Sequence, residues 1–193
     1  MKGCRALSDK EISRVSQAFT GVYALRNRAL FVTGVKTGFR ISELLSLRVW
    51  DVYQYGQILP SASVRKRSMK GRREGRCVPL HRDAQKALAA WIQELSQRQV
   101  ITRNTPLFSG AKFPERPITR VQAWSVLMQA FDRCGITGQL GTHVMRKTFA
   151  KRAHERVGHD LLKTQAALGH ANISNTVKYL SFDRADVDAA ILA

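Results

Sequence analysis

The 193-residue sequence has few cysteines, few acidic residues and no long apolar run, and each shortage excludes a class of protein. The cysteines, Cys4, Cys77 and Cys134, are odd in number, widely separated, and form no CxxC pair. This pattern argues against a disulfide scaffold and a zinc finger, and it is typical of reduced thiols in a cytoplasm. No apolar run approaches the ~20 residues of a membrane-spanning helix, and the opening MKGCRALSDKEISRV lacks the apolar core of a signal peptide. We therefore expect neither a secreted nor a membrane-spanning protein.

The shortage of acidic residues leaves a large excess of positive charge. There are 32 Lys and Arg against 14 Asp and Glu, which gives a formal net charge of +18. The positive electrostatic field of such a chain needs a polyanionic partner or an acidic surface. Because 44% of the residues are hydrophobic, the chain can also bury a core. Nucleic acid is therefore the expected partner of a folded domain.

Most of the apolar residues recur at helical spacing. We find no internal repeat, and no Pro/Gly-rich linker long enough to separate two domains. The expected helices are one that starts after Ser8, one over 24–33 that ends at Gly34, one that buries Ile41, Leu44 and Leu45, one with the stripe Ala84–Leu95, one with the stripe of Trp124, Leu127, Met128 and Phe131, and three over about 142–157, 161–168 and 174–180.

Between about 56 and 80 the pattern changes to short strands. QILP, ASVRKRSM and RCVPL read as strands, with GRREG as the turn between the last two. The fold class is therefore α+β, mostly helical, with a small antiparallel sheet on one side. The hairpin carries one acid, Glu74, against a set of cations, and such a hairpin can enter a DNA groove or lie along phosphates. These cations are Arg65, Lys66, Arg67, Lys70, Arg72, Arg73 and Arg76.

Three short segments carry residues suited to phosphate chemistry. In TGFRISELLSLRVWD, residues 37–51, Gly38 permits a tight turn, Arg40 follows at the start of a helix, and Glu43 can orient a neighbouring cation. In GTHVMRKTFA, residues 141–150, His143 and Arg146 share a helix face at i and i+3.

The third segment is ALGHANISNTVKYL, residues 167–180. Gly169 reads as a helix stop, and Asn172 or Ser174 as the cap of a short helix that carries Tyr179. By themselves the two short helices over 161–180 are also compatible with a non-catalytic helix-turn-helix DNA-binding protein. An RNA-binding protein is less favoured, because no aromatic stacking motif is present.

The order of these segments resembles the tyrosine recombinase (phage integrase) family, over about residues 8 to 182. The shared pattern is TGxRxxEL, a basic hairpin with Lys-Gly, HxxR, LGH and a tyrosine nine residues further on. The resemblance implies a site-specific DNA recombinase that cuts and rejoins DNA through a 3′-phosphotyrosyl intermediate. It implies that Arg40 and Arg146 clamp the phosphate, with His143 beside them and Glu43 as a supporting acid. It also implies that Tyr179 is the nucleophile and Lys70 the hairpin lysine. His170 matches the later family position that is His or Trp.

Two features depart from the family pattern. Family members often carry Gly before the hairpin lysine, whereas this chain has Met69, so Lys66 remains a rival to Lys70 as the general acid. Typical members also have a separate N-terminal core-binding domain, whereas Met1 lies at the start of the catalytic region. We expect residues 1–182 to form the catalytic domain, in either a truncated chain or a naturally minimal enzyme similar to the small recombinases that invert fimbrial switches.

The partners follow from the same reading. We expect double-stranded DNA, a homo-oligomer from dimer to tetramer on that DNA, and a C-terminal tail, 183–193, that docks on a neighbouring protomer. We expect no metal and no cofactor, because the sequence lacks an acidic cluster for magnesium and a complete phosphate-binding loop.

The expected location is cytoplasmic and nucleoid-associated. Type IB topoisomerases share the chemistry, and integration, excision and inversion all remain open. The additional DNA contacts are expected from Arg65, Lys66, Arg67, Arg72, Arg73 and Lys147.

Overall fold

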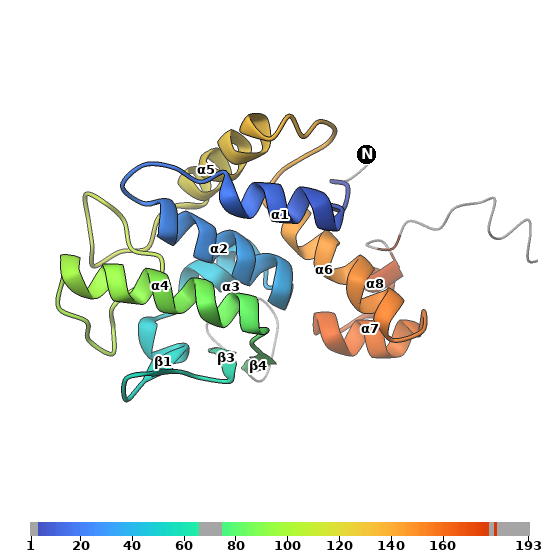
Figure 1. Cartoon of the computed structure of the whole chain (residues 1–193). Coiled ribbons are helices and arrows are strands. Elements are labelled where there is room, and N and C mark those ends of the chain that lie inside the picture. The colour runs from blue at the N-terminus through green and yellow to red at the C-terminus, as the bar shows by residue number, and fades with distance from the viewer. Residues whose placement is uncertain (1–3, 66–74, 178–179, 181–193) are drawn as a thin grey trace, which may run out of the picture. The chain divides into compact units, whose positions relative to one another are not determined.

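The computed structural model describes residues 4–65, 75–177 and 180 (Figure 1). The chain forms two compact units that divide after Phe149, within α6 (His143–Arg156).

Capping residues set where helices of the first unit begin. Ser8 precedes α1 (Asp9–Gln17) and forms a capping box, in which its hydroxyl accepts from the Glu11 amide while the Glu11 carboxylate accepts from the Ser8 amide. Thr119 and Gln122 form the same box at the start of α5 (Arg120–Arg133). These bonds satisfy amides that the first helical turn leaves unpaired. The helices of this unit that precede α6 are α1 (Asp9–Gln17), α2 (Ala24–Thr37), α3 (Ile41–Ser46), α4 (Arg82–Arg98) and α5 (Arg120–Arg133), with a 3-10 turn η1 (Val49–Asp51) after α3.

The second helix is longer than predicted. The expected break at Gly34 is wrong, because α2 continues through Gly34 and ends at Gly38, which has a φ of 63°. A Cβ at Gly34 would lie 2.4 Å from the Sδ of Met145. Gly34 therefore serves as a close crossing point between α2 and α6, and its missing side chain does not interrupt the helix.

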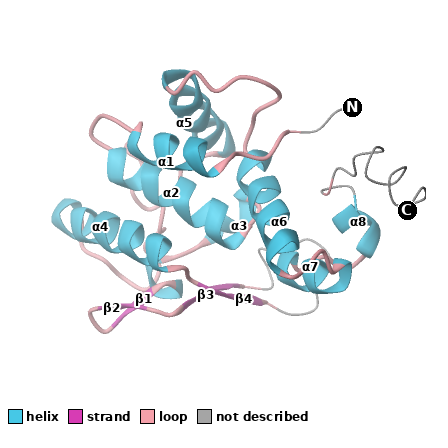
Figure 2. Ribbon diagram, turned by 45° about the vertical axis from the view of Figure 1, so that its right-hand side comes forward, coloured by secondary structure: helices cyan, strands magenta, loops and turns pink. Residues whose placement is uncertain are grey.

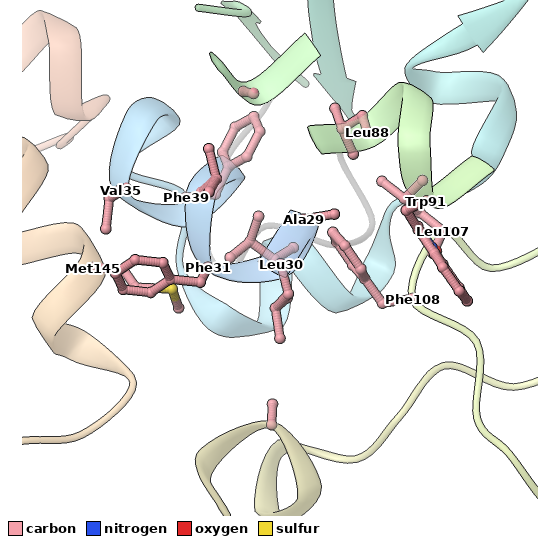
Figure 3. Close-up of a cluster of buried hydrophobic side chains, with 14 of the residues drawn as sticks. Ala29, Leu30, Phe31, Val35, Phe39, Leu88, Trp91, Leu107, Phe108 and Met145 are labelled. Carbon is pink, nitrogen blue, oxygen red and sulfur yellow. The ribbon is translucent and has the colours of Figure 1, made fainter. Parts of the chain in front are cut away.

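The core of the first unit forms around α2, which contacts α1, α3, α4 and α5. Leu30 and Phe31 are fully buried, and Figure 3 shows them between Met145 of α6 on one side and Trp91 of α4 and Phe108 on the other. The Trp91 Nε1 donates to the Leu107 carbonyl oxygen at 2.6 Å. A helix buried on most of its circumference explains why the residues of α2 show little amphipathic pattern.

The strands form two small antiparallel sheets. The pair β1 (Tyr53–Gln54) and β2 (Gln57–Ile58) is followed by the pair β3 (Ser61–Val64) and β4 (Arg76–Pro79). Figures 1 and 2 both place these strands beside α4, and β2 contacts that helix. The predicted small sheet on one side is confirmed, although β1 was not predicted. The residues expected to extend the third strand to 69 lie outside the described ranges.

The exposed aromatic on α5 corrects another prediction. Trp124 was assigned to the buried stripe, but 49% of it is exposed. The helix instead buries Leu127 and Phe131 together with Ala123 and Ala130. Trp124 lies outside this buried set and remains at the surface.

The segment before α1 is tied to the chain that leads into α6. The Arg5 amide donates to the Gln139 carbonyl oxygen at 3.2 Å, and Arg5 Nε donates to the Thr137 carbonyl oxygen at 2.9 Å. The amide of Leu7 donates to the Thr148 hydroxyl at 2.9 Å, in a buried position. Residues 5–7 thus connect both to the loop before α6 and to α6 itself.

The second unit contains the end of α6, α7 (Leu161–Leu168) and α8 (Ile173–Val177). Asp160 caps α7, and Gly169 ends it with a φ of 64°, which confirms both the predicted helix over 161–168 and its stop. The Asn172 side chain accepts from the Ser174 amide at 2.8 Å, so Asn172 is the cap of α8. The helix predicted over 174–180 begins one residue earlier and is described to Val177.

Among the described residues, no helix is both long and apolar enough to cross a membrane.

We expect Trp91→Phe to lower the free energy of unfolding by about 2–4 kcal/mol, because it leaves the buried Leu107 carbonyl without its donor and opens a cavity. Urea unfolding measures this change. Trp124→Phe is the matched control, since Trp124 is half exposed; its effect should stay within about 0.5 kcal/mol. Equal losses in the two variants would contradict the role assigned to the Trp91 hydrogen bond.

Candidate active site

Arg40 and Glu43 are joined at the start of α3. Arg40 is the N-cap of α3, one position before the first helical turn where it was predicted. Its Nη1 donates to Glu43 Oε1 at 2.9 Å, and its amide donates to Glu43 Oε2 at 2.8 Å. The Glu43 side chain is 2% exposed, whereas that of Arg40 is 40% exposed. The buried Glu43 carboxylate therefore holds both the backbone amide and one guanidinium nitrogen of Arg40, while the Arg40 side chain still reaches solvent.

Arg146 lies against the turn that precedes Arg40. It is 1% exposed, and its Nη1 donates to the Gly38 carbonyl oxygen. Residues 38–40 are called the Gly38 turn below. Because Arg146 bonds one end of this turn and Arg40 forms the other, the structure brings these two predicted arginines together. We call Arg40 and Arg146 the arginine clamp.

Gly38 is required at this turn for two reasons. Its φ of 63° lies in the left-handed region, which residues other than glycine rarely adopt. A Cβ there would also lie 2.3 Å from Cδ1 of the Phe149 ring. The turn can therefore approach α6 closely enough for its carbonyl to receive Arg146.

His143 lies near the arginine clamp at the first residue of α6. The pKa of its imidazole is lowered, first by desolvation and then by the positive charges of Arg146 and Arg40. A histidine with a lowered pKa is neutral near pH 7 and can accept a proton. The side chain nevertheless remains at the surface, where a substrate can reach it.

His170 belongs to the second unit, and its environment differs from that of His143. It is 6% exposed, and its Nδ1 and the Thr176 Oγ1 lie 2.9 Å apart in a hydrogen bond. Gln165 Nε2 donates to the His170 backbone oxygen at 3.0 Å. These bonds fix His170 between the end of α7 and the middle of α8. Thr176 was not predicted, although its place three residues before Tyr179 put it on the face of the same predicted helix.

Other predicted site residues are only partly placed. Arg65 is exposed and pairs with Asp51 at 3.3 Å, and Lys147 is half buried on α6. The remaining predicted residues lie outside the described ranges: Lys66, Arg67, Lys70, Arg72, Arg73 and Tyr179. Within the described ranges, no group of three or more His, Cys, Asp and Glu could hold a metal ion.

The first unit thus presents two arginines, one buried and one half exposed, and a neutral histidine beside one glycine turn. Fixed cations of this kind stabilise the charge on a phosphoryl group during its transfer. This geometry is therefore suited to binding a phosphate group.

Comparison with known proteins identifies the family. The sequence model of the phage integrase family matches residues 5–185, so the chain belongs to that family. It is 34% identical over 163 residues to the tyrosine recombinase XerD of Mycobacterium tuberculosis (strain CDC 1551 / Oshkosh), which covers 82% of this chain and 49% of the relative. It is 27% identical over 165 residues to a probable integrase/recombinase, YoeC, of Bacillus subtilis (strain 168), which covers 86% of this chain and 82% of the relative.

Solved structures share the fold. The XerA recombinase superposes with a TM-score of 0.76 at 24% identity, over 98% of this chain and 63% of that one. The XerH site-specific recombinase bound to its difH substrate superposes with a TM-score of 0.74 at 23% identity, over 100% of this chain and 54% of that one. The predicted α+β recombinase fold is therefore confirmed. The chain spans about half the length of XerD, and most of the length of YoeC.

We expect Gly38→Ala to lower the free energy of unfolding by about 2–5 kcal/mol, because left-handed strain adds to the overlap with Phe149. Gly56→Ala is the matched control, since Gly56 has a φ of 82° and nothing within 4 Å of the added Cβ. The control should lose only the strain contribution, about 1–2 kcal/mol. Urea unfolding of both variants compares them, and equal losses would show that Phe149 imposes no constraint.

Proposed function

We propose that this chain is a tyrosine-type site-specific DNA recombinase, which cuts and rejoins double-stranded DNA through a 3′-phosphotyrosyl intermediate. The observation that carries the proposal is the arginine clamp, in which Arg146 and the Glu43-bound Arg40 meet at the Gly38 turn. Family membership supports it, as does the DNA-bound state of the related XerH structure. The helix-turn-helix alternative is not favoured by these findings, because DNA reading alone does not require a buried arginine at a glycine turn.

The reaction exchanges one phosphoester bond for another. The Tyr179 oxygen forms a bond to the scissile phosphorus, the bond to the 5′-oxygen breaks, and that oxygen leaves with a proton as a hydroxyl group. The reverse attack by a 5′-hydroxyl restores the DNA strand and releases the tyrosine. Because the covalent bond retains the phosphoester energy, rejoining needs no ATP.

The described residues supply charge and a proton acceptor. Arg40 and Arg146 would neutralise the non-bridging oxygens as negative charge increases on them. His143 would accept the Tyr179 proton, because its lowered pKa keeps it neutral near pH 7. His170, fixed by Thr176, would donate a hydrogen bond to the same phosphate.

The general acid would come from the basic hairpin between β3 and β4. The leaving 5′-oxygen is far more basic than an ordinary acidic side chain, so its departure needs a proton donor. Lys70 is our candidate, with Lys66 as the rival. Neighbouring cations in the hairpin sequence would favour release of the lysine proton by like-charge repulsion.

The assembly and location extend the same proposal. A net charge of +18 favours double-stranded DNA as the partner, with Arg65, Lys147 and the cations of residues 66–74 as contacts. Residues 1–182 would act as the catalytic domain in a dimer to tetramer on DNA, with the tail 183–193 on a neighbouring protomer. The proposed location is the cytoplasm, at the nucleoid.

We expect Tyr179→Phe to abolish covalent capture of DNA, because phenylalanine has no oxygen to attack the phosphorus. A nicked duplex traps the adduct, which a denaturing gel then measures. Addition of EDTA to the unsubstituted protein should leave the adduct yield unchanged. An adduct that persists in Tyr179→Phe would assign the nucleophile elsewhere, and a strict metal requirement would contradict the side-chain mechanism.

A substrate with sulfur at the bridging 5′ position distinguishes the two lysines. A thiolate leaves without the proton that an alkoxide needs, since a thiol has a pKa of about 8.5. We therefore expect Lys70→Ala to cleave normal DNA slowly and to recover on the sulfur substrate. Arg40→Ala should remain impaired on both. Recovery of Lys66→Ala in place of Lys70→Ala would move the general acid to Lys66.

A further inference from the structure

An arginine at the base of the basic hairpin faces the interior of the protein. Arg76 begins β4 and pairs in register with Val64 of β3. It is 9% exposed, and it shares the buried face of the two strands with Ala62 and Val78. A charged side chain rarely occupies such a face unless it makes a specific contact.

That contact leads to the arginine clamp. The Arg76 guanidinium carbon lies 5.4 Å from the centroid of the Phe39 ring, within the range of a cation–π interaction. Phe39 is 1% exposed and is the middle residue of the Gly38 turn, and Figure 3 shows it within the core. Its two neighbours are Gly38, whose carbonyl receives Arg146, and Arg40.

We propose that Arg76 is a positioning residue for Arg40. Arg76 holds the Phe39 ring and thereby fixes the Gly38 turn, which ends in Arg40. This inference rests on the proposed recombinase function. An arginine suits the role because its guanidinium is planar, permanently charged and weakly hydrated, so it can stack on a ring when buried. The arrangement also joins the base of the basic hairpin to the Gly38 turn, where the arginine clamp lies.

Two modified substrates separate this role from a structural one and from an action on the hairpin lysine. A methylphosphonate at the scissile position removes the negative charge that Arg40 neutralises. A bridging 5′ sulfur removes the need for a general acid. A residue that acts through Arg40 should therefore matter less on the first substrate, whereas a residue that acts through the lysine should matter less on the second.

We expect Arg76→Met to slow adduct formation on normal DNA by about tenfold to a hundredfold, the scale expected for a displacement of about 1 Å in a catalytic group. The defect should shrink at least severalfold on the methylphosphonate and stay unchanged on the sulfur substrate. Arg40→Ala should show the same pattern, and Lys70→Ala the opposite one.

The matched control is Arg26→Met. Arg26 is likewise buried, at 6% exposed, and its guanidinium lies 4.3 Å from the centroid of the Tyr23 ring, but it bonds Asn27 and Ser109 and not the Gly38 turn. Any loss from general instability should be equal on all three substrates for this variant. An equal loss on all three for Arg76→Met would show that Arg76 is structural only and would overturn the proposal, as would recovery on sulfur alone.

A second pair of variants tests the route through the ring. Phe39→Leu should give the pattern of Arg76→Met, and the double variant should be no slower than Arg76→Met alone, since both changes break one contact. Additive losses would overturn the route through Phe39. If Arg76→Met does not fold, Arg76→Lys serves in its place, with a smaller defect of the same pattern. Absence of any adduct with the unsubstituted protein would instead contradict the recombinase function itself.

Discussion

The hydrogen bond from Arg146 to the Gly38 carbonyl is the interaction on which the site depends. A guanidinium that is 1% exposed needs strong acceptors, because burial of an unpaired charge is very unfavourable. The acceptor is available only because α2 ends in a left-handed glycine and Phe149 occupies the space that a side chain at Gly38 would fill. The end of one helix therefore determines where another helix can bury its arginine.

The two members of the arginine clamp are held in different ways. Arg146 is buried and bonded to the backbone, whereas Arg40 is half exposed and held by the carboxylate of Glu43. The Glu43 carboxylate offsets the positive charge of Arg40, whose Nη1 lies 2.9 Å from Glu43 Oε1. This division leaves one guanidinium buried and the other accessible to solvent. In the proposed recombinase, such preorganised charge would stabilise the phosphoryl group during its transfer.

Local signals made much of the fold predictable. Ser8 and Gly169 set helix ends through capping and left-handed geometry, and these effects depend on a few neighbouring residues. The family resemblance placed Arg40 and Arg146 in one expected site, and in the structure both lie at the Gly38 turn. Tertiary contacts were not predictable in this way: Gly34 is a crossing point with Met145, and Trp124 lies outside the core. The inward direction of Arg76 was likewise not predictable from its place among the positively charged hairpin residues. The direction of a strand side chain depends on the register of the strand pair.

The bonds made by residues 5–7 have a consequence for protein engineering. Leu7 is bonded to Thr148, two residues beyond Arg146, and Arg5 is bonded to the loop that enters α6. Within this unit, a displacement of residues 5–7 would therefore be transmitted to α6 close to Arg146. Substitutions at these residues need to preserve the Leu7 and Arg5 bonds if α6 is to keep its position against the Gly38 turn.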